Sequence, residues 1–115
     1  MKEINGKLTY KEKEYNVVFN LNVMQEIQEK YGTINKWADL TEGKGKEPDA
    51  KAIIFGFTAM LNEGLDIENE ETGSTFKPLT EKQVGRILTE IGFNNANEIM
   101  QKTVIESTKT EQKNV

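Results

Sequence analysis

The rest of the chain is expected to fold around residues 48–64, PDAKAIIFGFTAMLNEG. Apolar residues in this stretch recur at positions i, i+4, i+7 and i+8, so they form one helical stripe of Ile53, Phe57, Met60 and Leu61. Ile54 and Phe55 widen the stripe nearly all the way round, which predicts a buried helix. Asp49 is suited to cap the first turn, and Gly64 is predicted to end the helix in a left-handed conformation.

The length of the chain limits what can surround this helix. With 115 residues there is room for one core, so we expect a single α+β domain over residues 1–106. Residues 107–115 are polar and are predicted to form a disordered C-terminal tail. A domain of this size is marginally stable, and self-association would add to its stability.

Charge, cysteine content and hydropathy argue against nucleic acid as a partner, against disulfide bonds and against a membrane location. The net charge is -4 with acidic and basic residues interspersed, which argues against nucleic acid, because affinity for phosphates needs clustered Lys and Arg. The chain has no Cys, which excludes a disulfide framework and suits a reducing cytoplasm. No run approaches the roughly 20 apolar residues that span a bilayer, so we expect no membrane contact.

Residues 4–21 show the period-2 alternation of two β-strands joined by a polar turn at residues 11–14. One face of this hairpin carries Leu8, Tyr10, Val17 and Phe19, and Leu21 continues the alternation. An isolated hairpin is scarcely stable in water, so this face is expected to cover the central helix.

Two helices are predicted between the hairpin and the central helix. The first begins with Asn22 as its cap and ends at Gly32. A short second helix begins after the Thr33 cap, with Trp37 and Leu40 pointing inward.

Two more helices are predicted after the central one. Thr80 and Gln83 form a capping box for a helix that ends at Gly92, and residues 95–98 form a second box that begins the last helix. The sequence thus predicts an α+β fold, with an N-terminal antiparallel β-hairpin packed on a mainly helical domain of four to five helices. The predicted core consists of Leu8, Val17, Phe19, Ile27, Tyr31, Trp37, Ile53, Phe57, Met60, Leu61, Val84, Ile87, Leu88, Ile91 and Met100.

Two polar segments flank the central helix and are expected to be exposed connections. The first, TEGKGKE at residues 41–47, lacks the spacing and the following Ser or Thr of a phosphate-binding loop. The second, LDIENEETGST at residues 65–75, begins like a calcium loop, but Glu71 stands where the turn glycine is needed and Lys77 replaces the bidentate Glu. We therefore expect no metal site and no cofactor.

The residues for catalysis are scarce. The chain has no His and no Cys, and its only serines, Ser74 and Ser107, lie in polar segments, so nucleophile systems of the Ser-His or Cys-His type are excluded. No acidic residue interrupts an apolar stripe, where burial would raise its pKa. We expect no catalytic residue and a protein that is not an enzyme.

Residues 80–106 leave an alternative open, because they form a helix, a glycine turn and a second helix. This arrangement is also found in small DNA-associated or regulatory proteins. The second helix, however, offers mainly Asn, Glu and Gln side chains, with Lys102 as its one positive charge. An interaction protein fits the composition better.

The order of these features resembles the tail assembly chaperones of long-tailed bacteriophages, which also occur in prophages. The matching stretches are FNLNVM at residues 19–24 with EKYG at 29–32, AIIFGF at 52–57 with Leu61 and Gly64, and the cap at Leu79 and Thr80 with the helix to Gly92. Together they extend over nearly the whole chain. Each motif is loose, and the likeness lies in order and spacing.

The resemblance implies a non-enzymatic role in tail morphogenesis in the cytoplasm of the bacterial host. Such chaperones hold the long helical tape measure protein and recruit tail tube subunits while the tube polymerises, and they are not expected in the mature virion. Many are made in two lengths, and this chain would be the short form. The resemblance assigns no residues to the contact with the tape measure protein or the tail tube protein.

Overall fold

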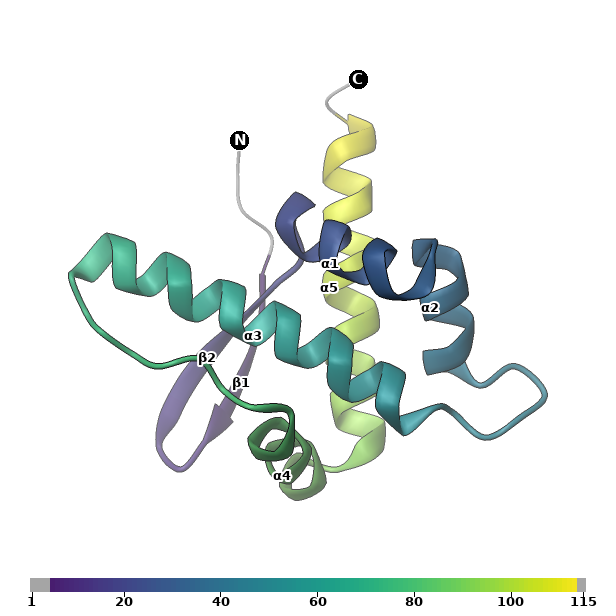
Figure 1. Cartoon of the computed structure of the whole chain (residues 1–115), viewed down its shortest axis with the longest axis horizontal. Coiled ribbons are helices and arrows are strands. Elements are labelled where there is room, and N and C mark those ends of the chain that lie inside the picture. Colours follow the sequence, from purple (N-terminus) through teal and green to yellow (C-terminus); the bar gives the residue numbers. More distant parts are fainter. Residues whose placement is uncertain (1–4, 114–115) are drawn as a thin grey trace.

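The computed structural model describes residues 5–113, with side chains described for residues 6–105. Its elements are β1 (Asn5–Tyr10), β2 (Lys13–Val18), α1 (Leu21–Tyr31), α2 (Ile34–Glu42), α3 (Ala50–Thr72), α4 (Glu81–Ile91) and α5 (Phe93–Lys113). The α+β prediction is confirmed, with an antiparallel hairpin and five helices within the described part of the chain. Figure 1 shows α3 crossing the front of the molecule, with α5 behind it.

Helix α3 is longer than predicted. Asp49 caps it by accepting a hydrogen bond from the Ala52 N–H at 3.0 Å, but the helix continues through Gly64 to a left-handed Gly73 with φ of 71°. The prediction that Gly64 ends the helix is therefore wrong. Gly64 is buried where a Cβ would lie 2.5 Å from the Asn16 carbonyl oxygen, so its small size lets α3 approach β2. The acidic stretch after it is helix and not an exposed connection.

The hairpin has a two-residue turn at Lys11 and Glu12, whose φ angles of 49° and 66° are both positive. The predicted alternation holds at Leu8 and Val17, which are buried while their strand neighbours Lys7 and Asn16 are exposed, but it fails at Val18, which is buried as well. Strand β2 packs on α3, as predicted, and β1 packs on α5.

The start of α1 differs from the prediction. Asn20 and not Asn22 is the N-cap, and its side chain accepts a hydrogen bond from the Val23 N–H at 3.2 Å. Leu21, which was expected to continue the buried face of the hairpin, is the first residue of the helix and is 70% exposed. The chain turns out of the sheet at the cap, so the strand alternation stops there.

Local signals place the other helix ends correctly. Gly32 ends α1, Thr33 caps α2, Thr80 and Gln83 form both bonds of the capping box, and Gly92 ends α4. Within α2 the prediction for Leu40 is wrong, because this side chain is exposed, while Thr41 beside it is buried and donates to the Ala38 carbonyl at 2.8 Å.

One cluster of buried side chains joins the hairpin and the helices. Every residue of the predicted core is buried, except Tyr31 and Ile91, which are partly exposed and pack against the cluster. Trp37 packs on Gly56, where a Cβ would clash with the indole ring, and its Nε1 donates to the Ala52 carbonyl at 3.0 Å. The described residues that are buried but lie outside that predicted core list are Val18, Val23, Thr41, Ala52, Gly56, Ala59, Gly64, Leu65, Ala96 and Thr103.

Helix α5 begins earlier and ends later than predicted. It starts at Phe93, so Asn95 does not cap it and instead donates its side-chain N–H to the Ile91 carbonyl at 3.1 Å. The backbone stays helical through Lys113, where the sequence predicted disorder from residue 107. After Gly92 the chain contains no Gly or Pro to break a helix, and Glu, Gln and Lys are good helix formers. Residues 1–4 and 114–115 lie outside the described residues.

Candidate protein-binding surface

The outward side of α3 is bordered by two other helices. In Figure 1 α1 lies above α3 and α4 lies below it, and both pack against α3. Between them Ile54, Phe55 and Thr58 are partly exposed, whereas the opposite side of α3 is buried. We call this surface the α3 face. It is formed by Tyr31, Ile54 and Phe55 together with the α4 residues beside Ile54, which are Glu81, Lys82, Gly85, Arg86, Thr89 and Glu90. The sequence predicted apolar residues nearly all round α3, and this is the part that no described element covers.

An aromatic pair lies at the α1 border of the α3 face. The rings of Tyr31 and Phe55 meet edge to face, with centroids 5.8 Å apart and planes inclined by 73°. The Lys30 ammonium lies 4.8 Å from the centroid of the Phe55 ring. Burial raises the pKa of the Tyr31 hydroxyl, and the carboxylates of Asp49 and Glu81 raise it further. Partly exposed aromatic side chains of this kind are common anchors in protein interfaces.

An open hollow lies at the α4 border of the α3 face. It is lined by Ile54, Glu81, Lys82, Gly85, Arg86, Thr89 and Glu90. Gly85 leaves the hollow open above Ile54, since a Cβ at this position would lie 3.6 Å from the Ile54 Cδ1. An apolar floor with charges of both signs at the rim is typical of a protein-binding surface.

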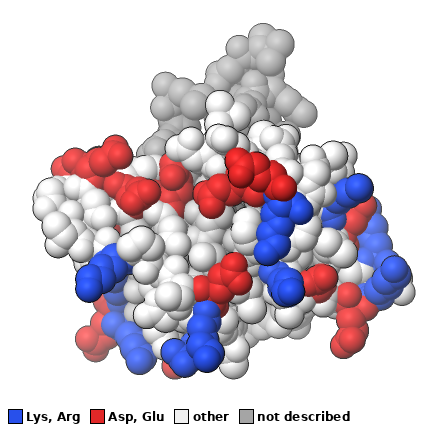
Figure 2. Space-filling model, in the orientation of Figure 1, with Lys and Arg blue, Asp and Glu red and all other residues white. Residues whose placement is uncertain are grey.

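Acidic side chains follow the upper border of the molecule. Burial raises the pKa of the Glu26 carboxyl, and the nearby charges of Glu63, Glu29 and Asp66 add to the shift. Glu63 accepts hydrogen bonds from the side chains of Asn20 and Asn22, at 2.7 and 3.0 Å. Figure 2 shows acidic side chains across the upper part of this view and basic ones mainly below and to the right. The α1 border of the α3 face therefore carries Lys30 beside Phe55, with the acidic Glu26 and Glu29 elsewhere on the same helix.

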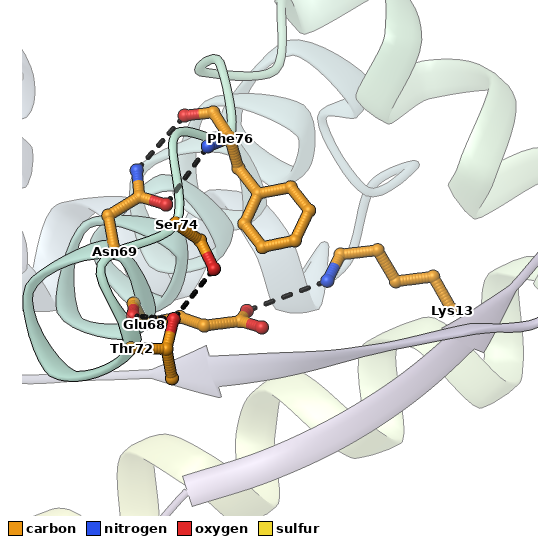
Figure 3. A network of polar contacts seen from close by, with 6 residues as sticks. All are labelled: Lys13, Glu68, Asn69, Thr72, Ser74 and Phe76. Carbon is orange, nitrogen blue, oxygen red and sulfur yellow. Dashed lines mark hydrogen bonds and ion pairs between the residues drawn. The ribbon is translucent and has the colours of Figure 1, made fainter.

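The far end of α3 carries a polar network with a structural role (Figure 3). Asn69 donates to the Phe76 carbonyl at 3.0 Å and accepts from the Phe76 N–H at 2.9 Å, which holds the segment after α3 against the helix. The Lys13 ammonium lies 3.5 Å from the Glu68 Oε1 and 4.0 Å from the centroid of the Phe76 ring. These contacts connect the hairpin turn to α3, and they use the acidic stretch that resembled a calcium loop.

The described residues supply no site for metal chemistry. Among the side chains that the structure describes, residues 6–105, no three His, Cys, Asp or Glu lie close enough together to hold a metal ion. The GKGK segment forms the turn after α2, where Gly43 is left-handed and Lys44 pairs with Asp39 at 3.4 Å. No helix in the part of the chain that the structure describes is long and apolar enough to cross a membrane.

The helical pair of α4 and α5 presents little positive charge. Ala96, Met100 and Thr103 of α5 are buried, which leaves Asn94, Asn95, Glu98 and Lys102 exposed. On α4 the bases Lys82 and Arg86 share the rim of the hollow with Glu81 and Glu90. A helix that enters the major groove needs a surplus of positive charge, which these described residues do not provide.

Comparison with known proteins gives no match. No protein-family model matches the chain, and no curated protein or solved structure matches it. The function is therefore inferred from the chain's own residues and from the resemblance described above.

Proposed function

We propose that this protein is a non-enzymatic tail assembly chaperone that binds a helical segment of the tape measure protein and helps to recruit tail tube subunits. The observation that supports binding is the α3 face, where the partly exposed Tyr31, Ile54 and Phe55 lie between two flanking helices. The resemblance supplies the identity of the partners and the cytoplasmic location in the host.

The chemistry of the α3 face favours an amphipathic helix as its occupant. Such a helix would place apolar anchors at i, i+3 or i+4, and i+7 against Phe55 and Ile54. A basic flank on the same helix would face the carboxylates of Glu26 and Glu29, which steers association and fixes orientation.

Co-expression of the full chain with the tape measure protein tests the proposal. We expect the tape measure protein to be retained on the tagged chain, and a Phe55→Ala variant to lose affinity by about tenfold or more, as for a buried aromatic anchor. Phe76→Ala is the control, since this aromatic side chain is also exposed to solvent but lies at the far end of α3, away from the α3 face.

A second pair of variants tests the charge without disturbing the core. Glu29→Lys should weaken binding severalfold at low salt and less at high salt, whereas Glu12→Lys in the hairpin turn should have little effect. Binding that survives Phe55→Ala and Glu29→Lys would move the site away from the α3 face. Failure to retain any tape measure protein, together with retardation of duplex DNA at about 150 mM salt, would favour the regulatory alternative.

A further inference from the structure

The outer edge of β1 carries open hydrogen-bonding groups. Tyr10 lies opposite Lys13 across the two-residue turn, so the even-numbered residues of β1 carry the hydrogen bonds to β2. The odd-numbered residues Lys7 and Thr9 therefore direct their backbone N–H and C=O groups away from β2. No described group pairs with these backbone groups, and both side chains are exposed.

The other edge of the hairpin is closed. On β2 the carbonyl oxygen of Asn16 points at Gly64, where even a Cβ would lie only 2.5 Å away, so α3 covers this edge. Helix α5 packs on the face of β1, where a Cβ on Gly6 would clash with Thr103, and not on its outer edge. The hairpin thus has one open edge, and unpaired edges of this kind are templates for another strand.

We propose that the β1 edge pairs antiparallel with the β1 edge of a second copy of the chain, which gives a four-stranded sheet. This goes beyond the proposed function and is independent of the tape measure protein. A second copy is the favoured occupant because the edge is self-complementary in one register. Since α3 closes the β2 edge of each copy, pairing stops at two copies.

Lysine positions select that register. Inter-chain hydrogen bonds require outward-facing residues to lie opposite each other, and three two-fold registers place both Lys7 and Thr9 opposite outward-facing residues between Asn5 and Lys11 of the second copy. One places Lys7 opposite Lys7 of the second copy, and another places Lys7 opposite Lys11; like charges directly opposite are destabilising. The third places Lys7 opposite Thr9 and centres the two-fold axis at Leu8. It makes two hydrogen-bonded pairs, each exchanging two N–H···O bonds.

Cysteine cross-linking tests this register, because the native chain has no Cys. In the proposed dimer Lys7 and Thr9 of the two copies form a hydrogen-bonded pair with Cα atoms about 5.5 Å apart, within disulfide range. Two copies of the same position are diagonal neighbours about 7–8 Å apart, beyond that range. A mixture of Lys7→Cys and Thr9→Cys proteins should give a disulfide heterodimer, and each variant alone should give several times less.

A mixture of Glu14→Cys and Asn16→Cys is the matched control, because these residues are exposed at equivalent positions on the closed strand. Cross-linking of Lys7→Cys alone at the level of the mixture would overturn the register. A mixture that cross-links no better than the β2 control would overturn the pairing itself.

Sedimentation of the cysteine-free chain tests the association directly. Because the shared edge is short, we expect a weak dimer whose population grows between about 5 and 500 µM protein. Thr9→Pro removes an outward N–H that the hairpin does not use, so it should abolish the dimer, whereas Thr9→Ala should keep it. Far-UV circular dichroism checks that the proline variant stays folded. A wild-type chain that is monomeric throughout this range, or a Thr9→Pro variant that dimerises equally well, would refute the proposal.

Discussion

Replacing Gly64 with alanine should destabilise the protein, although alanine is the better helix former. Inside an ordinary helix this change gains about 0.5–1 kcal/mol. Here the new Cβ would lie 2.5 Å from the Asn16 carbonyl oxygen and 3.3 Å from its carbon, both backbone atoms of β2. Normal contacts between carbon and oxygen begin at about 3.3 Å, so α3 and β2 must separate by roughly 0.8 Å.

Such overpacking costs about 1–3 kcal/mol, so after the gain in helix propensity the net loss is about 1 kcal/mol in mid-range and at most about 2.5 kcal/mol. For a chain of 115 residues a loss of about 1 kcal/mol lowers the melting temperature by roughly 4 °C. Gly85→Ala is the matched control in α4, because its Cβ would meet only the Ile54 Cδ1 at an ordinary 3.6 Å. This variant should be more stable than the wild type by about 0.5–1 kcal/mol.

Urea denaturation followed by far-UV circular dichroism measures both variants. Equal stabilisation by Gly64→Ala and Gly85→Ala would refute the close contact between α3 and β2. Gly64→Asn separates this contact from the helix end that the sequence predicted. A left-handed helix end tolerates asparagine, whereas a helix interior facing β2 should be harmed more by asparagine than by alanine.

Three further changes test the core, the turn and the acidic border. Phe57 is fully buried, so Phe57→Ala should cost about 3–5 kcal/mol, and an unchanged urea midpoint would mean that the core is misplaced. Lys11→Asn combined with Glu12→Gly should stabilise the hairpin by roughly 1 kcal/mol, because Asn-Gly suits a turn with two positive φ angles; a lower melting temperature would contradict this turn geometry. Glu26→Gln should stabilise the protein at neutral pH by roughly 0.3 kcal/mol, the size of a like-charge repulsion on a helix surface. Folding raises the pKa of the Glu26 carboxyl above its ordinary 4.5, so folding disfavours the charged form, and this destabilisation disappears as the pH falls through the raised pKa. The gap between Glu26→Gln and wild type, measured by urea denaturation, should therefore close toward about pH 4, and a gap that widens there would contradict the assignment.

Helix ends were predictable where the signal is contained in a few neighbouring residues. The side chain of Thr33 bonds the N–H three residues later, at 3.0 Å, and Thr80 does the same at 3.1 Å, so the local sequence determines these caps. The prediction for Gly64 is wrong because a glycine can end a helix or can lie inside a helix where a strand packs closely, and the residue type is the same in both cases. Only the position of Asn16, far away in the sequence, separates the two roles.

The candidate surface could be predicted in part. The sequence placed Ile54 and Phe55 on a stripe nearly all round α3, but the stripe does not say which part the other helices leave open. That depends on where α1 and α4 lie, because α1 packs on α2 and α3 while α4 packs on α3 and α5. The open edge of β1 could not be predicted from the sequence either. It is open because α3 covers the edge of β2 and not the edge of β1.

The two proposed surfaces lie on opposite sides of the hairpin, so one does not obstruct the other. In the dimer the order of elements across the sheet is α3, β2 and β1, followed by the same elements of the second copy in reverse. Three strand spacings of about 4.8 Å, with about 10 Å between α3 and β2 at each end, place the two α3 axes roughly 34 Å apart where they pass β2 at Gly64. A continuous helix covers this distance in about 23 residues, so a long helical partner is of the right length to contact both copies. A peptide with two copies of the bound tape measure segment at that spacing should bind wild type at least tenfold more tightly than a single copy does, and it should lose this advantage with Thr9→Pro. An advantage that persists in Thr9→Pro would show that the two copies are not joined through β1.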